Sequence, residues 1–109
     1  MNKEELKELI YEALEIPVIK DGDLKLPLNQ VEIRNYDEKS RPYGRTQTRY
    51  TEYITEYNYV SENSLSKEEF LNLLKPYNPT GIIYEPIKKK LTFGDRRIYY
   101  RHILKTGMM

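Results

Sequence analysis

The side chains that could perform chemistry in this sequence are few and widely spaced. His102 is the single histidine and there is no cysteine, which excludes a catalytic triad, a thiolate metal site and a disulfide. Glu52 and Glu56 share one side of an expected strand, where the strand rise separates them by roughly 13 Å, too far for shared acid–base work. Asp21 and Asp23 flank a glycine, a pattern typical of a turn.

Metal and phosphate chemistry also lack a recognisable pattern. A metal-dependent nuclease would need acids that converge beside a lysine, and Glu85 near Lys88, with Pro86 between them, is the nearest approximation. The five glycines are isolated, so there is no Gly-rich phosphate loop, and no zinc or calcium spacing is present. We therefore predict a protein that is not an enzyme, with no catalytic, cofactor-binding or metal-binding residues.

The sequence indicates no membrane association. It begins MNKEELKELI, which is charged and contains no apolar segment of the kind that a signal peptide needs. No apolar run approaches the ~20 residues of a membrane-spanning helix. The absence of cysteine fits a reducing compartment.

The near-zero net charge conceals a polarity along the chain. Residues 1–40 carry six Lys/Arg and ten Asp/Glu, a balance of −4, whereas residues 41–109 carry twelve and seven, a balance of +5. Three interpretations fit this asymmetry: a nucleic-acid surface, a solvated basic hairpin, or complementary ends that meet in a self-assembling ring.

The patterning of apolar residues predicts a single α+β domain covering residues 1–109. Asp21-Gly22 predicts a small hairpin, and Gly107-Met108-Met109 is expected to be a loose tail. The order of elements favours a mainly antiparallel sheet with two amphipathic helices packed on one face. The expected elements are helices at about 3–15 and 67–75, with strands at about 30–36, 46–60, 87–93 and 96–105.

The expected strand 46–60 carries most of the functional signal. Residues 45–60 hold four of the eleven tyrosines, and neither side of the strand is cleanly apolar. Either a bulge switches faces midway, or one face packs on helices while the other meets a neighbouring subunit. Tyrosine gives apolar area at low entropy cost and tolerates a polar partner, so we predict an interface formed by Tyr50, Tyr53, Tyr57, Tyr59, Arg96, Arg97, Tyr99 and Arg101.

The C-terminal hairpin is the best candidate for a nucleic-acid surface. Strand alternation, however, sends Lys89 to the face opposite Lys88 and Lys90, so the lysine run does not form one continuous patch. The residues that would supply charge and stacking are Lys88, Lys89, Lys90, Arg96, Arg97, Arg101, Tyr99 and Tyr100.

Three features together resemble a phage structural family. The chain opens with a short amphipathic helix, NKEELKELIYEAL; a long strand, TRYTEYITEYNYVSEN, then leads into a capped helix, SLSKEEFLNLLKPY; and the end is a basic, aromatic strand after a Gly-Asp turn, GDRRIYYRHIL. This layout is similar to that of the tail-terminator, or tail-completion, proteins of long-tailed non-contractile phages, and it also fits other head-to-tail connector proteins.

The resemblance implies a virion structural protein assembled in the host cytoplasm. Such a protein would form a homo-oligomeric ring, usually a hexamer, that ends the tail tube and binds connector proteins, with at most transient, non-specific DNA contact in the channel. The alternative is a small soluble phage-encoded binding protein, either a nucleic-acid binder or an inhibitor of a host protein.

Overall fold

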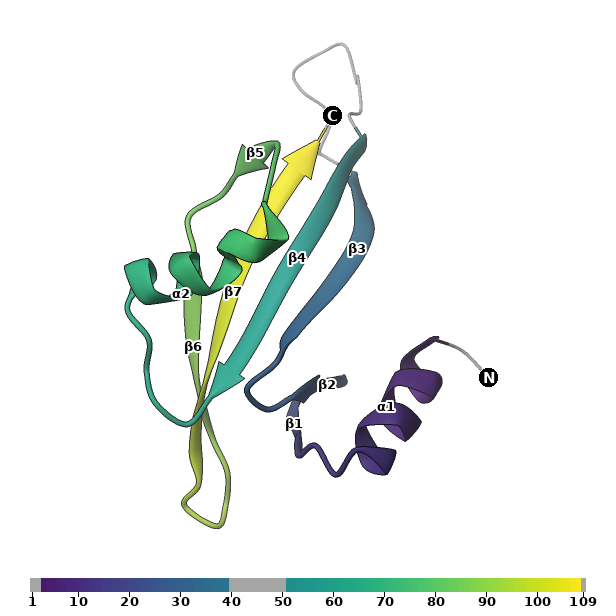
Figure 1. Cartoon of the computed structure of the whole chain (residues 1–109), viewed down its shortest axis with the longest axis vertical. Coiled ribbons are helices and arrows are strands. Elements are labelled where there is room, and N and C mark those ends of the chain that lie inside the picture. Colours follow the sequence, from purple (N-terminus) through teal and green to yellow (C-terminus); the bar gives the residue numbers. More distant parts are fainter. Residues whose placement is uncertain (1–2, 40–50, 109) are drawn as a thin grey trace.

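The computed structural model describes residues 3–39 and 51–108. It contains a helix, α1 (Lys3–Ala13), a short hairpin of β1 (Val18–Asp21) and β2 (Leu24–Pro27), and then β3 (Val31–Lys39) and β4 (Thr51–Ser61). A second helix, α2 (Lys67–Leu74), continues into a 3₁₀ turn, η2 (Lys75–Tyr77). The chain ends with β5 (Ile82–Ile83), β6 (Ile87–Thr92) and β7 (Ile98–Met108). This antiparallel sheet with two short helices confirms the predicted α+β class (Figure 1).

The main sheet is antiparallel throughout. Its order is β3-β4-β7-β5, and β6 pairs with β7 beside β5. The pairing of β4 with β3 runs without a shift from Thr51 to Tyr59, so the predicted bulge is absent from the described part of this strand. In β3 and β4, successive side chains therefore point to opposite faces of the sheet, so alternate residues share a face.

One face of the sheet packs against α2. Alternation places Val31, Ile33, Tyr57, Tyr59 and Leu104 on this face, where they contact the helix. The apolar positions of α2 that complete the cluster are Phe70, Leu71, Leu73 and Leu74. Ser66 and Glu69 cap the start of the helix with a reciprocal capping box, as the S-x-x-E spacing of the sequence indicates.

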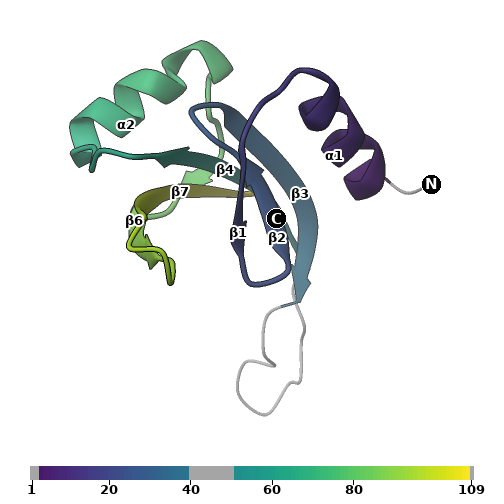
Figure 2. The same ribbon diagram turned by 90° about the horizontal axis from the view of Figure 1, so that it is seen from below.

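The β1–β2 hairpin covers the opposite face at one end of the sheet. Ile19 and Leu26 of the hairpin pack against Val60, Leu91 and Tyr99. Gly22 takes the left-handed conformation (φ 63°) in the turn, which confirms the hairpin that Asp21-Gly22 predicts. Figure 2 looks along the sheet and shows α2 and this hairpin on opposite sides of β4 and β7.

The prediction that both helices pack on one face is wrong. Lys7 and Tyr11 of α1 both bind the carboxylate of Glu32, and alternation puts Glu32 on the face of β3 opposite Val31 and Ile33. The helix lies beside the β3 edge of the sheet (Figure 2). The four residues Leu14–Pro17 link it to β1, so α1 is joined directly to the hairpin and not to α2.

The ends of several predicted elements also move. The first helix stops at Ala13, two residues early, because Glu15 adopts a positive φ of 57°. β3 runs to Lys39 rather than residue 36, and residues 46–50 of the expected long strand lie outside the described part of the chain. The predicted loose tail is wrong as far as Met108, since Gly107 and Met108 pair with Ile54 and Tyr53 of β4.

The molecule is elongated for its length. Its radius of gyration is 16.0 Å and its extents are 50 × 37 × 31 Å, whereas a compact domain of this length has a radius of gyration of about 13 Å. The end of β4 near Val60 is covered on both faces, whereas Tyr53 near its other end is exposed, as are Leu6, Leu9 and Ile10 of α1.

Candidate interaction surfaces

The predicted interface residues separate into buried and exposed groups. Tyr57 and Tyr99 keep only 7% and 8% of their surface exposed, and Arg101 keeps 5%. These three residues belong to the interior, so predicting them as interface residues was wrong. Tyrosine-rich strands look the same in sequence whether their rings meet α2 or another molecule, and only the register distinguishes the two.

The remaining predicted residues stay at the surface. Tyr53 is 59% exposed, and Tyr59 is half-buried with its ring 6.3 Å from that of His102. Arg96 is exposed at positive φ (68°) in the β6–β7 turn. Arg97 is exposed, pairs with Asp95, and lies 5.7 Å from the ring centroid of Phe93. Tyr50 lies outside the described residues.

Arg101 is the centre of a buried polar network under the β1–β2 hairpin. Its guanidinium donates to Oδ1 of Asn58 at 2.7 and 2.9 Å and to Oδ2 of Asp21 at 2.6 Å. Glu56, 4% exposed, accepts from Arg34 at 2.9 Å and from Asn58 at 3.2 Å. Burial of this kind is tolerated because each charge has a partner, so the network attaches the hairpin to the sheet.

The carboxyl of Asp21 joins this network to β6. Lys89 Nζ reaches its two oxygens at 2.8 and 3.1 Å. Burial alone would raise the pKa of Asp21, but the hydrogen bonds from Lys89 and Arg101, together with their charges, lower it below the ordinary value. The ionised carboxylate is therefore the form that holds the hairpin in place.

His102 has a structural role. Its Nδ1 lies 3.0 Å from the carbonyl oxygen of Tyr59, and its Nε2 accepts a hydrogen bond from the backbone N–H of Leu65 at 3.0 Å. The ring also packs 5.5 Å from that of Phe70. Burial lowers the pKa of His102, which keeps the ring neutral and able to accept the Leu65 bond.

The acids that the sequence offers for catalysis do not converge. Glu52 accepts a hydrogen bond from the Tyr84 hydroxyl, and this bond raises the pKa of Tyr84. Glu85 instead pairs with Lys67 at 2.7 Å. Across residues 3–39 and 51–108, no group of three or more His, Asp or Glu side chains is placed to hold a metal ion.

Two of the three lysines of β6 hydrogen-bond to other groups of the same chain. Lys88 donates to Ser64 Oγ at 2.7 Å and to the carbonyl of Leu65 at 3.0 Å. Lys89 is on the opposite face and binds Asp21, so the predicted splitting of the lysine run is confirmed. With Arg101 buried as well, the hairpin offers less cationic surface than its composition suggests.

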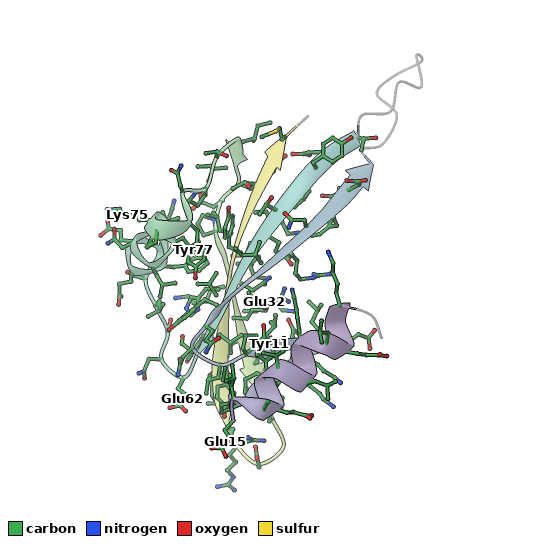
Figure 3. All side chains as sticks on the ribbon, turned by 45° about the vertical axis from the view of Figure 1, so that its right-hand side comes forward. Tyr11, Glu15, Glu32, Glu62, Lys75 and Tyr77 are labelled. Carbon is green, nitrogen blue, oxygen red and sulfur yellow. The ribbon has the colours of Figure 1, made fainter. Side chains whose placement is uncertain are left out.

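One exposed apolar surface is the stripe of α1, formed by Leu6, Leu9 and Ile10 together with Leu14, the residue that follows the helix. These side chains are 52%, 48%, 48% and 64% exposed. Lys7 and Tyr11 both bind Glu32, and Figure 3 shows Tyr11 on the side of the helix toward Glu32. These contacts leave the stripe exposed. The sequence predicted an amphipathic helix here, but it could not indicate that nothing among residues 3–39 and 51–108 buries this apolar face.

A second exposed apolar group lies at the opposite end of the molecule. It includes β5 and its neighbours at the ends of β4 and β7 (Figure 1). Gly81 enters β5 at φ 91°, and a Cβ there would lie 2.5 Å from the carbonyl oxygen of Gly107, so this approach requires glycine. The exposed side chains are Tyr53, Ile82, Ile83, Tyr84 and Met108.

Three surface cavities accompany these patches. One of about 210 Å³ lies between the start of α2 and β6, and an open one of about 500 Å³ lies between β3 and η2. The third, of about 240 Å³, lies between β1 and the β6–β7 turn; Val18, Ile19, Lys20, Phe93, Arg97 and Tyr99 line it. Lys67, Glu85, Lys88 and His102 all line the first cavity, but Lys67 pairs with Glu85, and Lys88 and His102 hydrogen-bond to groups of the same chain.

Comparisons with known proteins do not assign the chain to a family. No family model, no curated protein and no solved structure matches it. In addition, no helix among the described residues is long and apolar enough to cross a membrane. The class that the fold defines is therefore an α+β domain built on a twisted antiparallel sheet, with exposed apolar side chains on its first helix.

Proposed function

We propose that this chain is a non-enzymatic structural subunit of a long-tailed phage virion, a ring-forming tail terminator or head–tail connector that joins the tail tube to the neck. In this role it works by contacts with other copies and with tail-tube and connector proteins. No bond is made or broken, and no cofactor is required.

The observation that carries this proposal is the exposed stripe of α1. Three aliphatic side chains of the helix and Leu14 directly after it, each about half exposed or more, form an apolar patch of a kind that often marks an interaction site. A surface of this kind is typical of a protein that is completed by another molecule. The elongated shape and the exposed patch around β5 support the same interpretation.

The distribution of charge supports contacts between unlike surfaces. The acidic N-terminal third and the basic C-terminal part attract each other between copies, and contacts between different surfaces generate rings or filaments. The internal partners of Lys88, Lys89 and Arg101 support a minor and non-specific role for DNA.

A small soluble phage-encoded binding protein is the second candidate. The same α1 stripe favours it, because an inhibitor of a host protein would also keep an apolar face for its target. A nucleic-acid binder that used the C-terminal hairpin has less support, since the cationic residues of that hairpin without a described internal partner are Lys90 and Arg96, with Arg97 paired to its neighbour Asp95.

Light scattering at several concentrations tests the two candidates. A discrete ring, formed alone or only when the tail-tube protein is added, is the result we expect. A chain that stays monomeric with and without the tail-tube protein contradicts the virion role. Binding of such a monomer to DNA, with affinity falling steeply as salt increases, would support the nucleic-acid alternative.

A further inference from the structure

The stripe of α1 has an acidic border on its outward side. Residues 3–15 contain two lysines and five glutamates. Glu5 lies four residues before Leu9 and Glu12 lies three after it, so both are neighbours of Leu9 on the helix surface. Lys7 and Tyr11 instead bind Glu32, and Figure 3 shows Tyr11 on the flank of the helix that faces Glu32. Any partner of this helix therefore meets aliphatic side chains bordered by carboxylates.

The border restricts what can cover the stripe. A second α1 would bring together two segments 3–15, each with a net charge of −3, and such like charges oppose pairing. Nucleic acids and anionic lipid surfaces are repelled for the same reason. The complementary surface must combine an apolar floor with a cationic rim.

The cavity between β1 and the β6–β7 turn has this composition. Ile19 and Tyr99 form a buried apolar floor, and the half-buried ring of Phe93 forms one wall. Lys20 and Arg97 are exposed at its margin. Arg97 pairs with Asp95, but both side chains are more than half exposed, so this pair is easily exchanged for another. The volume of about 240 Å³ admits an aliphatic side chain.

The two surfaces are different patches of one molecule: the stripe lies on α1, and the cavity is formed by β1, which the four residues Leu14–Pro17 join to α1, and by the β6–β7 turn. Figure 2 shows α1 beside β3 at one edge of the sheet, and the β6–β7 hairpin at the other edge. A contact between them therefore joins two copies head to tail. Repetition of such a contact gives a ring or a filament.

We propose that α1 of one copy docks on the cavity between β1 and the β6–β7 turn of a second copy. Leu9 and its neighbours enter the apolar floor, and Glu12 faces Lys20 and Arg97. This inference rests on the proposed self-assembling function and identifies the surfaces that carry it.

Cysteine cross-linking tests the contact directly, because the chain has no cysteine of its own. The single variants Leu9→Cys and Lys20→Cys both replace exposed side chains. Mixed and oxidised, they should form the mixed disulfide faster than either forms a homodimer, since a disulfide requires close Cα atoms. Thr80→Cys, exposed in the loop before β5, replaces Lys20→Cys as the matched control.

The cross-linking result can overturn the contact in two ways. Equal yields with Lys20→Cys and Thr80→Cys would show that α1 has no preference for the cavity. A disulfide within one chain of the double variant Leu9→Cys/Lys20→Cys, with no link between chains, would show that α1 docks on its own cavity instead.

A charge exchange tests the rim. Glu12→Arg and Arg97→Glu should each weaken self-association about tenfold or more, because each places like charges together. A mixture of the two variants should associate again, since it recreates one complementary pair. Lys75→Glu, with the same change of charge at an exposed site on the other face, should leave association unchanged.

The outcomes separate this contact from the proposed function. If the wild-type chain forms oligomers and every one of these variants forms them equally well, the contact is overturned and the virion role is left standing. A wild-type chain that is monomeric at every concentration also overturns the contact, and the mixture with the tail-tube protein then decides the function. Thermal unfolding of each variant shows that lost association is not lost folding.

Discussion

The two helices are built to the same pattern and lie in opposite environments. Both carry acids in the first turn and an apolar stripe at helical spacing. In α2, Phe70 and Leu74 are 2% and 1% exposed against β4 and β7. Leu9 of α1 and Leu14 directly after it are 48% and 64% exposed. An amphipathic stripe thus specifies that a helix has an apolar face, but not whether that face is covered by the same chain.

The attachments of the two helices differ in kind. α2 is held by an apolar cluster and by the Leu65–His102 bond at its start. α1 is held to the sheet by polar contacts to Glu32. Apolar burial scales with area and is insensitive to salt, whereas a part-exposed ion pair contributes little. We therefore expect α2 to unfold with the whole domain and α1 to open by itself at much lower cost.

The largest effect expected from this comparison is the difference in stability between two single substitutions, one in each helix, that shorten an apolar side chain. Phe70→Ala should lower the free energy of unfolding by about 3–5 kcal/mol, because it leaves a cavity under α2. Leu9→Ala should change it by less than about 0.5 kcal/mol, as for other exposed sites. Urea unfolding of dilute monomer measures both. Similar losses for the two variants would mean that the α1 stripe is buried within its own chain.

The next effect concerns the hairpin that follows α1. Asp21→Asn should destabilise the fold by roughly 1–3 kcal/mol, since Arg101 and Lys89 lose a charged acceptor. Because the folded pKa of Asp21 is lowered, its stabilisation is present above the unfolded pKa, near 4, and is lost as pH falls through the folded pKa. Stability curves from pH 5 to pH 2 should therefore be flatter in the variant. Parallel curves for both proteins would contradict this role.

A smaller, helix-specific effect follows from His102. Its folded pKa is lowered from about 6.5, so the neutral ring stabilises the fold at pH above 6.5, and this contribution is lost as pH falls from 7 through the folded value. Protonation removes the acceptor of the Leu65 bond. His102→Gln, which does not titrate, should flatten the pH 5–7 region of the stability curve at a cost of about 1 kcal/mol.

Hydrogen exchange can localise this effect of pH. The exchange of amides in the Ser64–Phe70 region should rise on acidification, while that of α1 amides, corrected for intrinsic rate, should not. An equal rise in both helices would mean that the two attachments are coupled.

The smallest effect is expected at the attachment of α1. Glu32→Gln weakens the contacts of Lys7 and Tyr11 and should cost about 0.5–1 kcal/mol or less. Hydrogen exchange should increase in residues 5–13 alone, with no change in α2. Glu85→Gln, which affects the exposed pair with Lys67, is the matched control and should leave α1 unchanged. Faster exchange throughout the sheet would show that Glu32 supports the core as well.

Local patterns predicted much of the fold because they act over a few residues. The S-x-x-E cap of α2, the Asp21-Gly22 turn and the alternation that separates Lys88 from Lys89 all appear as expected. Each depends on backbone geometry that neighbouring residues fix by themselves. The candidate surface was less predictable, since Tyr53 and Tyr57 share one face of β4, yet Tyr57 is buried and Tyr53 is exposed.

The sequence by itself determined that this is an α+β domain with two amphipathic helices, a polarised charge and no cysteine or histidine pair for catalysis. Only the tertiary structure decided that α1 and α2 contact opposite faces, that Arg101 is an internal anchor, and that the α1 stripe lies open. The physical reason is range: caps, turns and alternation are local, whereas burial depends on which strands pair, and in what register, across residues far apart in the chain.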